Sequence, residues 1–356
     1  MKGIYLYRAF SRDRYPETAP LRASDYLATW LEAFPDSQPM RERQRFRDDP
    51  HCDFEDWSEN VVILHEANAR GIPVRILPSA PHLWVSTSGW QTPISVSGAP
   101  VGAMFGGWSA ADYMDGLPVP ISLAGQDSAA VDAASNYAAS PVFLRHAGRR
   151  MIFVDATNED LERALAEILG DRPETVVFLK SVRKQFSGTA HIVAGTSLRQ
   201  QVFEQMDGLD LEIVHYEGDR RLLLVQDAVH CGYEYRFFVV DGRIVTGAGC
   251  VVQHTPLDNT EVFDPQMKTV RDSSEVGTYP AVRDQHLAFA RTFVEEFSAE
   301  HGRRLDYCLD VALDDQGRTF VIELNPPLNC GRYASDVGVW MDAIVARTEE
   351  CAKMRD

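Results

Sequence analysis

The chain has 356 residues, 45% of them hydrophobic and 24% charged, which is ordinary for a globular protein with room for two or three packed lobes. Its net charge of −17 argues against nucleic acid as the main partner, because phosphate contacts need a basic surface. No apolar run of about 18 residues and no signal-peptide core occurs, so we expect a cytoplasmic protein without membrane contact. The six cysteines form no C-x-x-C pair, which predicts reduced thiols.

Residues 1–105 are predicted to form an α/β lobe of their own. A short strand is expected at residues 4–7, and helical spacing follows a serine N-cap at 24–34. A second helix is closed by Gly71 and leads into a strand at 73–77. This order of helix, glycine and strand is typical of α/β folds.

The following stretches alternate regularly between strands and helices, which favours a second, larger domain over residues 106–356. The patterns predict helices at 158–169 and 198–206 and strands at 142–145, 151–154, 176–180, 191–193 and 222–226. Next, Asp241-Gly242 between two apolar runs is a strong hairpin signal. Further on we expect a helix at 283–300, a hairpin of strands 307–313 and 319–324, and a last helix at 339–351.

Residues 255–280 are polar, contain three prolines and show little periodicity. Segments of this length without regular structure are lids, substrate loops or disordered insertions. The cations Lys268 and Arg271 in this segment could meet a substrate carboxylate or phosphates. Both alternatives, a lid and a disordered surface insertion, stay open at this point.

A hairpin over residues 307–325 carries the clearest chemical pattern. Glu323 and Asn325 are two apart in a strand and share a face, and Asp310 lies on the partner strand. Two carboxylates and an amide oxygen are ligands that suit Mg²⁺ together with nucleotide phosphates and water. The alternative is a polar hairpin that faces solvent. Against it, the flanking residues are apolar.

Two more stretches fit a nucleotide. An apolar strand delivers Lys180 to a Ser/Gly turn with Lys184 and Gly188, where backbone N–H groups and ammonium groups could hold phosphates. The other reading of Lys180 is a solvated lysine at a strand end. Apolar residues 222–225 lead into a linker that could bind an adenine edge through its backbone, and Glu234 sits where it could take a ribose hydroxyl. The linker comprises Gln226, Asp227, Ala228 and Val229. The alternative there is a buried strand and a surface turn.

In order and spacing, these features resemble the ATP-grasp superfamily from about residue 110 to 345. More narrowly they resemble its R2K clade, through the motif F-L-K-x-x-x-K-x-F-S-G at 178–188, E-Y-R-x-F-V-V-D-G at 234–242, and E-L-N-P with G-x-Y-A-x-D at 323–336. The resemblance implies two α+β lobes that grip ATP, a nucleotide lobe at about 140–230 and a metal-binding lobe at about 231–350. The first 105 residues correspond to a pre-ATP-grasp lobe.

The resemblance also implies a role for each residue. Lys180 would hold the α- and β-phosphates, residues 226–229 would form the adenine hinge, Glu234 would take the ribose, and Arg236 would meet the γ-phosphate or an acyl phosphate. The metal ligands would be Asp310, Glu323 and Asn325. Arg145 stands where many relatives have another nucleotide-binding lysine, and Arg332 and Cys330 occupy the substrate side.

The activity that the resemblance implies is ATP- and Mg²⁺-dependent ligation of a carboxylate to an amine or thiol through an acyl phosphate. The substrates would be an amino acid, a peptide or a protein terminus. Two alternatives remain: phosphoryl transfer to a hydroxyl, and a non-catalytic nucleotide-binding protein of regulation or defence. The retained metal triad argues against the second. Neither the substrates nor the oligomeric state follow from the sequence.

Overall fold

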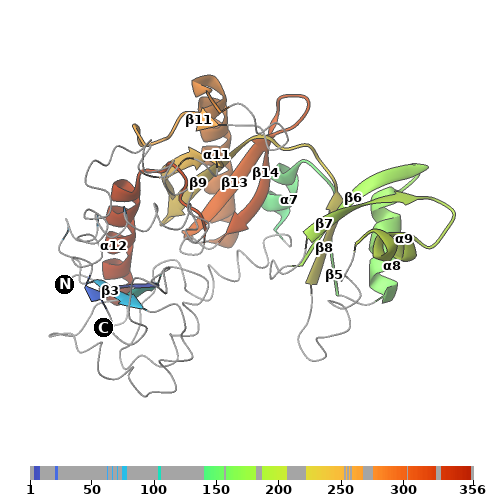
Figure 1. Ribbon diagram of the computed structural model, residues 1–356, viewed down its shortest axis with the longest axis horizontal. Coiled ribbons are helices and arrows are strands. Elements are labelled where there is room, and N and C mark those ends of the chain that lie inside the picture. The colour runs from blue at the N-terminus through green and yellow to red at the C-terminus, as the bar shows by residue number, and fades with distance from the viewer. Residues whose placement is uncertain are drawn as a thin grey trace, which may run out of the picture. The chain divides into compact units, whose positions relative to one another are not determined.

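The computed structural model describes residues 4–8, 21–22, 62, 66, 70, 74–77, 103–105, 140–155, 158–181, 187–206, 222–251, 254, 256, 259–267, 276–302, 304–325 and 330–353. The chain forms two compact units (Figure 1). The first unit comprises residues 1–134, 232–312 and 322–356, and the second comprises residues 135–231 and 313–321.

The second unit is built on a four-stranded antiparallel sheet in the order β5-β8-β6-β7. Helices α8 and α9 lie side by side and pack on the sheet (Figure 1). The predicted helix at 158–169 is confirmed with the same bounds. The elements are β5 (Met151–Asp155), α8 (Asn158–Leu169), β6 (Glu174–Ser181), β7 (Ser187–Val193), α9 (Leu198–Gln205) and β8 (Leu222–Asp227).

The core of this unit lies between the helices and one face of the sheet. Val177 and Leu179 of β6 are fully buried there against apolar residues of α8 and α9. Because successive side chains of a strand point to opposite faces, Phe178 and Lys180 belong to the face away from these helices. Both are half-buried. The helix-free face of the sheet therefore carries the lysine that the sequence singled out.

Residues 140–147 correct one prediction. The stretch at 142–145 was predicted as a strand, but it is part of helix α7 (Pro141–Ala147). Ser140 caps this helix by accepting a hydrogen bond from the Phe143 N–H at 3.0 Å, and Pro141 occupies the first turn. Serine before proline is a helix-start signal, and in this short segment it outweighs the apolar run.

The first unit contains a second four-stranded sheet, in the order β10-β9-β13-β14. Helices α11 and α12 pack against β9 and β10. The predicted strand at 307–313 is confirmed, and the predicted helices at 283–300 and 339–351 are confirmed with longer bounds. The elements are β9 (Gly232–Val240), β10 (Arg243–Gly249), α11 (Pro280–His301), β13 (Tyr307–Leu313), β14 (Thr319–Asn325) and α12 (Val337–Lys353).

The hairpin of β9 and β10 turns at the predicted dipeptide. Asp241 and Gly242 both have positive φ angles, 51° and 63°, as the primed turns of tight hairpins require. The Asp241 N–H donates to Asp306 Oδ1 at 2.6 Å, and the Gly242 N–H donates to the Leu305 carbonyl at 3.0 Å. The turn is thereby tied to the chain that leads into β13.

A small third sheet contains the N-terminal strands, in the order β2-β3-β1-β4. Strand β1 runs parallel to both β3 and β4. The predicted strands at 4–7 and 73–77 are thus confirmed, whereas the predicted helix at 24–34 lies outside the described residues. The bounds are β1 (Ile4–Arg8), β2 (Leu21–Arg22), β3 (Val74–Leu77) and β4 (Ala103–Phe105).

Part of the segment 255–280, for which a lid and a disordered insertion were both left open, has regular structure. Strands β11 (Gln266–Met267) and β12 (Gly277–Thr278) pair antiparallel, and Phe263 bridges to Gly247 of β10. Its apolar residues explain the anchoring, because Met267 is fully buried. Lys268 and Arg271 lie outside the described residues. In the described part of the chain, no helix has the length and apolar character to cross a membrane.

Candidate functional site

The three residues predicted to bind metal meet on one face of the sheet in the first unit. Asp310 lies on β13, and Glu323 and Asn325 lie on β14. The amide Nδ2 of Asn325 donates to Asp310 Oδ2 at 2.7 Å and to Glu323 Oε1 at 2.9 Å. Asp310 and Asn325 are each 1% exposed, so the two carboxylates converge in a mostly buried place.

Arg236 of β9 holds Asp310 from the other side. Its Nε and Nη2 donate to Oδ1 and Oδ2 of Asp310 at 2.7 and 2.8 Å, and its Nη1 donates to the Gly331 carbonyl at 3.1 Å. Burial lowers the pKa of this guanidinium, but the adjoining Asp310 carboxylate outweighs burial and leaves the pKa well above its ordinary value. Arg236 is therefore charged and fixes the orientation of Asp310.

Glu234, two residues before Arg236 on the same strand, adds a third carboxyl group to this face. Burial and the Asp310 and Glu323 carboxylates together raise its pKa to about 7, against the lowering effect of Arg236. The Glu234 carboxyl is thus influenced by two other carboxylates and by one guanidinium. Among these four described residues the acidic groups outnumber the basic one, which favours a cation.

Arg332 is buried rather than open to a substrate. It is 3% exposed and its guanidinium lies between the rings of Phe238 and Trp340, at 5.2 and 4.2 Å from their centroids. Its Nη1 donates to the Cys330 carbonyl at 2.9 Å and contacts Cys330 Sγ at 3.4 Å. The Arg332 side chain would have to move to touch a substrate. Its contact with Cys330, by contrast, is already made.

Cys330 in turn lies against Cys308 of β13, with 3.0 Å between the two sulfur atoms. Burial raises the pKa of Cys330, but the hydrogen bond from Cys308 and the charges of Arg236 and Arg332 bring it down to about 6. Burial raises the pKa of Cys308 well above its usual value. The two shifts therefore favour the thiolate at Cys330 and the thiol at Cys308.

In the second unit, Lys180 stands near the end of β6, as the sequence predicted. Its register partners are Ser187 on β7 and Leu224 on β8. Lys184 lies outside the described residues. Gly188 was predicted in a turn, but it belongs to β7 and pairs with Leu179, because the ladder continues up to Ser187. A Cβ at Gly188 would come within 2.5 Å of the methyl group of Met206, so a larger residue here would require that flexible side chain to move.

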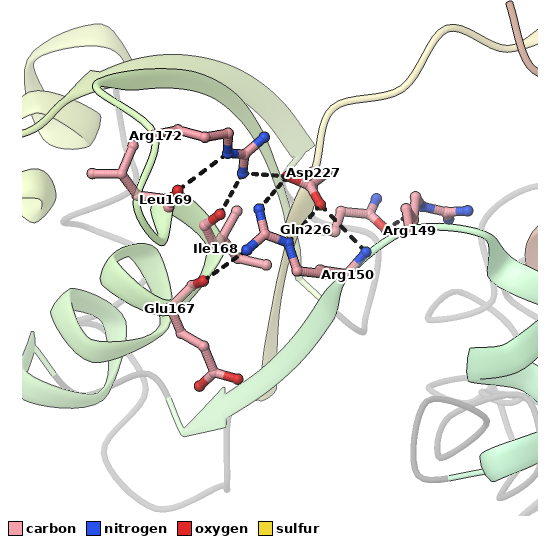
Figure 2. Close-up of polar contacts among 8 residues, drawn as sticks. All are labelled: Arg149, Arg150, Glu167, Ile168, Leu169, Arg172, Gln226 and Asp227. Atoms are coloured by element: carbon pink, nitrogen blue, oxygen red, sulfur yellow. Dashed lines mark hydrogen bonds and ion pairs between the residues drawn. The ribbon is translucent and has the colours of Figure 1, made fainter.

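Gln226 of β8 shares the helix-free face with Lys180, since it lies two residues beyond the register partner Leu224. Its Oε1 accepts a hydrogen bond from Arg149 Nε at 2.9 Å (Figure 2). Arg149 also donates through Nη1 to the carbonyls of Ala147 and Val321, at 3.0 and 2.7 Å. The Gln226 side chain is thus held in one orientation by a residue that no sequence motif indicated.

The next linker residue, Asp227, is an ion-pair centre (Figure 2). Its carboxylate accepts from Arg172 at 2.7 Å and from Arg150 Nε at 3.2 Å. Burial raises the pKa of Asp227, but the hydrogen bonds and charges of the two arginines outweigh it and lower the pKa overall. The carboxylate therefore anchors the linker to the sheet and to the end of α8.

The backbone of the linker is partly committed to the sheet as well. The Asp227 N–H donates to the Arg150 carbonyl at 3.2 Å, and the Ala228 N–H donates to the Val176 carbonyl at 3.1 Å. An adenine edge would therefore be met by linker carbonyls or by the Val229 amide. The backbone N–H groups of Asp227 and Ala228 are thus already used within the sheet, which leaves fewer donors at the predicted hinge.

Arg145, predicted as a further nucleotide contact, is exposed in the last turn of α7. The arginines that the prediction missed are Arg149, Arg150 and Arg172. A signal was present for two of them, because Arg149-Arg150 directly follows the helix-ending Gly148 and precedes a strand. Arg172 gave no signal, since its partner is 55 residues away in sequence.

A family model described as the ATP-grasp domain, R2K clade family 2, matches residues 154–343, which is more than half of the chain. The chain belongs to this family. The predicted ATP-grasp fold is thereby confirmed. The matched range includes Lys180, Arg236 and the cluster of Asp310, Glu323 and Asn325, whereas Arg145 and Arg149 precede it.

The chain is also similar, at low identity, to solved structures. D-alanine–D-alanine ligase from Bacillus anthracis complexed with ATP is 12% identical, with 86% of this chain and 96% of that chain covered and a TM-score of 0.47. A RimK domain ATP-grasp protein from Sphaerobacter thermophilus is 15% identical, with 83% of this chain and 94% of that chain covered and a TM-score of 0.40. The ATP-grasp ligase PsnB complexed with a minimal precursor is 14% identical, with 98% of this chain and 100% of that chain covered and a TM-score of 0.42. A search of curated proteins finds no match.

Within this ATP-grasp protein, the described residues contain no group of three or more His, Cys, Asp and Glu side chains that could hold a metal ion. The cluster on β13 and β14 has two carboxylates, and its third member is an amide. Such a set depends on further oxygen ligands to complete an octahedron.

Proposed function

We propose that this ATP-grasp protein is an ATP- and Mg²⁺-dependent ligase that joins a carboxylate to an amine or thiol. The observation that carries the proposal is the convergence of Asp310, Glu323 and Asn325 beside Arg236. The carboxylate substrate would be an amino acid, a peptide or a protein terminus. Family membership supports nucleotide-dependent chemistry, and the donor set supports the metal.

The donor set fits Mg²⁺ on chemical grounds. Each carboxylate oxygen has two lone pairs, so Asp310 Oδ1, which accepts one hydrogen bond from Arg236, retains capacity for a cation, whereas Oδ2 accepts from both Arg236 and Asn325. A half-turn of the Asn325 amide would present its oxygen in place of its nitrogen. A cation would also offset the acidic excess that raises the pKa of Glu234. Asp310, Glu323 and Asn325 would therefore hold the ion.

The second unit offers the nucleotide contacts. Lys180 would hold phosphates, and Lys184 and Arg145 would add positive charge. Gln226 to Val229 would meet the base, with Gln226 held in place by Arg149. The ribose contact is proposed for Glu234. Bound ATP and Mg²⁺ would supply the phosphoryl group that activates the carboxylate and the charge that offsets its phosphates.

The remaining steps belong to residues of the chain itself. Arg236 holds Asp310 through two hydrogen bonds, so the acidic cluster is set before any ligand binds. Lys180 brings a compact ammonium whose charge stabilises the transferring phosphoryl group. An activated carboxylate hydrolyses readily, so the site must exclude water, and the near-complete burial of Asp310 and Asn325 is consistent with this.

Product analysis tests the proposal. The purified protein would be incubated with ATP, Mg²⁺ and a pool of amino acids and short peptides, and products would be identified by mass spectrometry. The ligase proposal predicts a condensed product formed in equal amount to ADP and phosphate, and none with Glu323→Ala. A phosphorylated hydroxyl compound would favour phosphoryl transfer instead. ATP binding without any product would favour a non-catalytic nucleotide-binding protein.

A further inference from the structure

Cys308 and Cys330 are placed for direct reaction with one another. Their sulfur atoms lie 3.0 Å apart, and a disulfide needs about 2.05 Å, so closing the bond requires a movement of about 1 Å. Of the four cysteines whose side chains the structure describes, these two are the pair in contact. Cys308 is fully buried on β13, while Cys330 is half-buried in the chain after β14.

The surroundings of Cys330 favour oxidation. Arg332 Nη1 lies 3.4 Å from its sulfur and also donates to its carbonyl. A neighbouring guanidinium stabilises a thiolate, which is the form that reacts with oxidants. Cys308 would then act as the resolving thiol, since it is in contact and shielded from solvent.

The cysteine pair is connected to the acidic cluster at both ends. Cys308 and Asp310 are two residues apart on β13 and share a face. Gly331 follows Cys330 directly, and its carbonyl accepts a hydrogen bond from Arg236, which holds Asp310. A movement of about 1 Å at the sulfurs would therefore be felt by both supports of Asp310.

We propose that Cys308 and Cys330 form a reversible disulfide on exposure to a hydroperoxide, and that this oxidation weakens the adjoining Mg²⁺ and nucleotide site. The effect on the site rests on the proposed function, whereas the disulfide itself does not. The disulfide would act on activity through the neighbouring residues Arg236 and Asp310.

The chemistry balances with a hydroperoxide as the two-electron oxidant. The Cys330 sulfur attacks the peroxide, the O–O bond breaks, and a sulfenic acid forms at Cys330 with release of water or an alcohol. The Cys308 thiol then attacks that sulfur, the S–S bond forms, the S–O bond breaks, and water leaves with the thiol proton. Two thiols and one molecule of hydrogen peroxide thus give one disulfide and two molecules of water.

The first experiment treats the reduced full-length protein with hydrogen peroxide and maps its peptides by mass spectrometry. We expect a cross-linked peptide pair containing Cys308 and Cys330, which dithiothreitol reverses. The same pair should form in Cys231→Ser, a matched change at a cysteine outside the pair. Cys308→Ser should instead trap a dimedone adduct at Cys330. Retention of both thiols, or a link to another cysteine, would overturn the proposal.

The second experiment measures Mg·ATP affinity before and after oxidation. Oxidised wild type should bind at least tenfold more weakly, with recovery after dithiothreitol, while peroxide should leave the Mg·ATP affinity of Cys308→Ser and Cys308→Ala unchanged. Thermal unfolding of each variant verifies that it is folded. If the cross-link forms and affinity is unchanged, the coupling to the site is wrong. If the reduced protein does not bind Mg·ATP, the proposed function fails and the disulfide result still stands.

Discussion

Two residues on the helix-free face of the second unit illustrate how far single positions can be predicted. Lys180 was recognisable because an apolar strand ends in a lysine within a chain of few lysines. Arg149 was not, because its contact with Gln226 joins positions 77 residues apart. Sequence patterns show which residue types a strand presents, and they do not show which distant side chain completes the hydrogen bonds.

Replacement of Lys180 tests the phosphate contact. Lys180→Ala should weaken Mg·ATP binding by about tenfold or more, the size of a lost charge-assisted hydrogen bond, and Lys180→Arg should recover only part, because guanidinium is bulkier and planar. Isothermal titration calorimetry measures both. Arg163→Ala, which removes an exposed cation from α8, serves as the control. Wild-type affinity in Lys180→Ala would assign the phosphates to another cation.

Glu323 tests the metal assignment. Glu323→Ala should lower turnover by more than about a hundredfold with little change in thermal stability, because it removes a carboxylate from the proposed metal site. Glu295→Ala on the exposed face of α11 should leave both quantities unchanged. ADP release and the unfolding temperature are the two measurements. Full turnover in Glu323→Ala would remove this residue from the metal site.

Asp264 makes a pH-dependent contribution to stability. Its side chain is fully buried, neither carboxyl oxygen has a hydrogen-bond partner of normal geometry among the described residues, and burial raises its pKa to about 7, with an opposing effect of the Gln266 N–H. The folded state therefore holds the proton more tightly than the unfolded state. The stabilisation is complete below pH 3.8 and is lost as pH rises to about 7.

Asp264→Asn should remove that dependence, because the amide is uncharged at every pH. Unfolding temperatures at pH 5.5, 7 and 8.5 measure it, with Asp284→Asn as the control at an exposed carboxylate. The stability of wild type relative to Asp264→Asn should fall by on the order of 1 kcal/mol across this range. A constant difference would mean that Asp264 is ionised in the folded protein throughout.

Among the elements, the hairpins were the most predictable, and their turns explain why. Asp241-Gly242 imposes positive φ angles that few residues adopt, so the dipeptide fixes the turn and with it the register of β9 and β10. Helix α7 was predicted as a strand, and the start of strand β7 was predicted as a turn, for the opposite reason. Their sequences allow two local structures, and the Ser140 cap and the ladder between Lys180 and Ser187 decide between them.

The turn can be tested with two glycines of nearly equal φ. Gly302 ends α11 at 62° in open space, so Gly302→Ala should lose about 1 kcal/mol from backbone strain alone. At Gly242, with φ of 63°, a Cβ would also lie 3.1 Å from the Arg304 side chain and 3.2 Å from Ser298 Oγ. Gly242→Ala should therefore lower the free energy of unfolding, measured in urea, by more than Gly302→Ala does. Equal losses of free energy in the two variants would show that the Arg304 and Ser298 side chains move aside without cost.

For the whole molecule, the order of motifs predicted the fold better than any one motif did. The family match over residues 154–343 covers the strand lysine, the hairpin with Arg236 and the acidic cluster in the predicted order. What the sequence could not supply is how these groups are supported. The clamp of Arg236 on Asp310 and the enclosure of Arg332 between Phe238 and Trp340 depend on side chains brought together by folding.

The central claim is that the protein activates a carboxylate with ATP, and oxygen transfer tests it most directly. Amino acids and peptides labelled with ¹⁸O in their carboxylates would be incubated with the protein, ATP and Mg²⁺, and the released phosphate would be analysed by mass spectrometry. Our account predicts one ¹⁸O atom in each phosphate formed, because a carboxylate oxygen leaves with the phosphoryl group. Unlabelled phosphate, formed together with a condensed product, would contradict it.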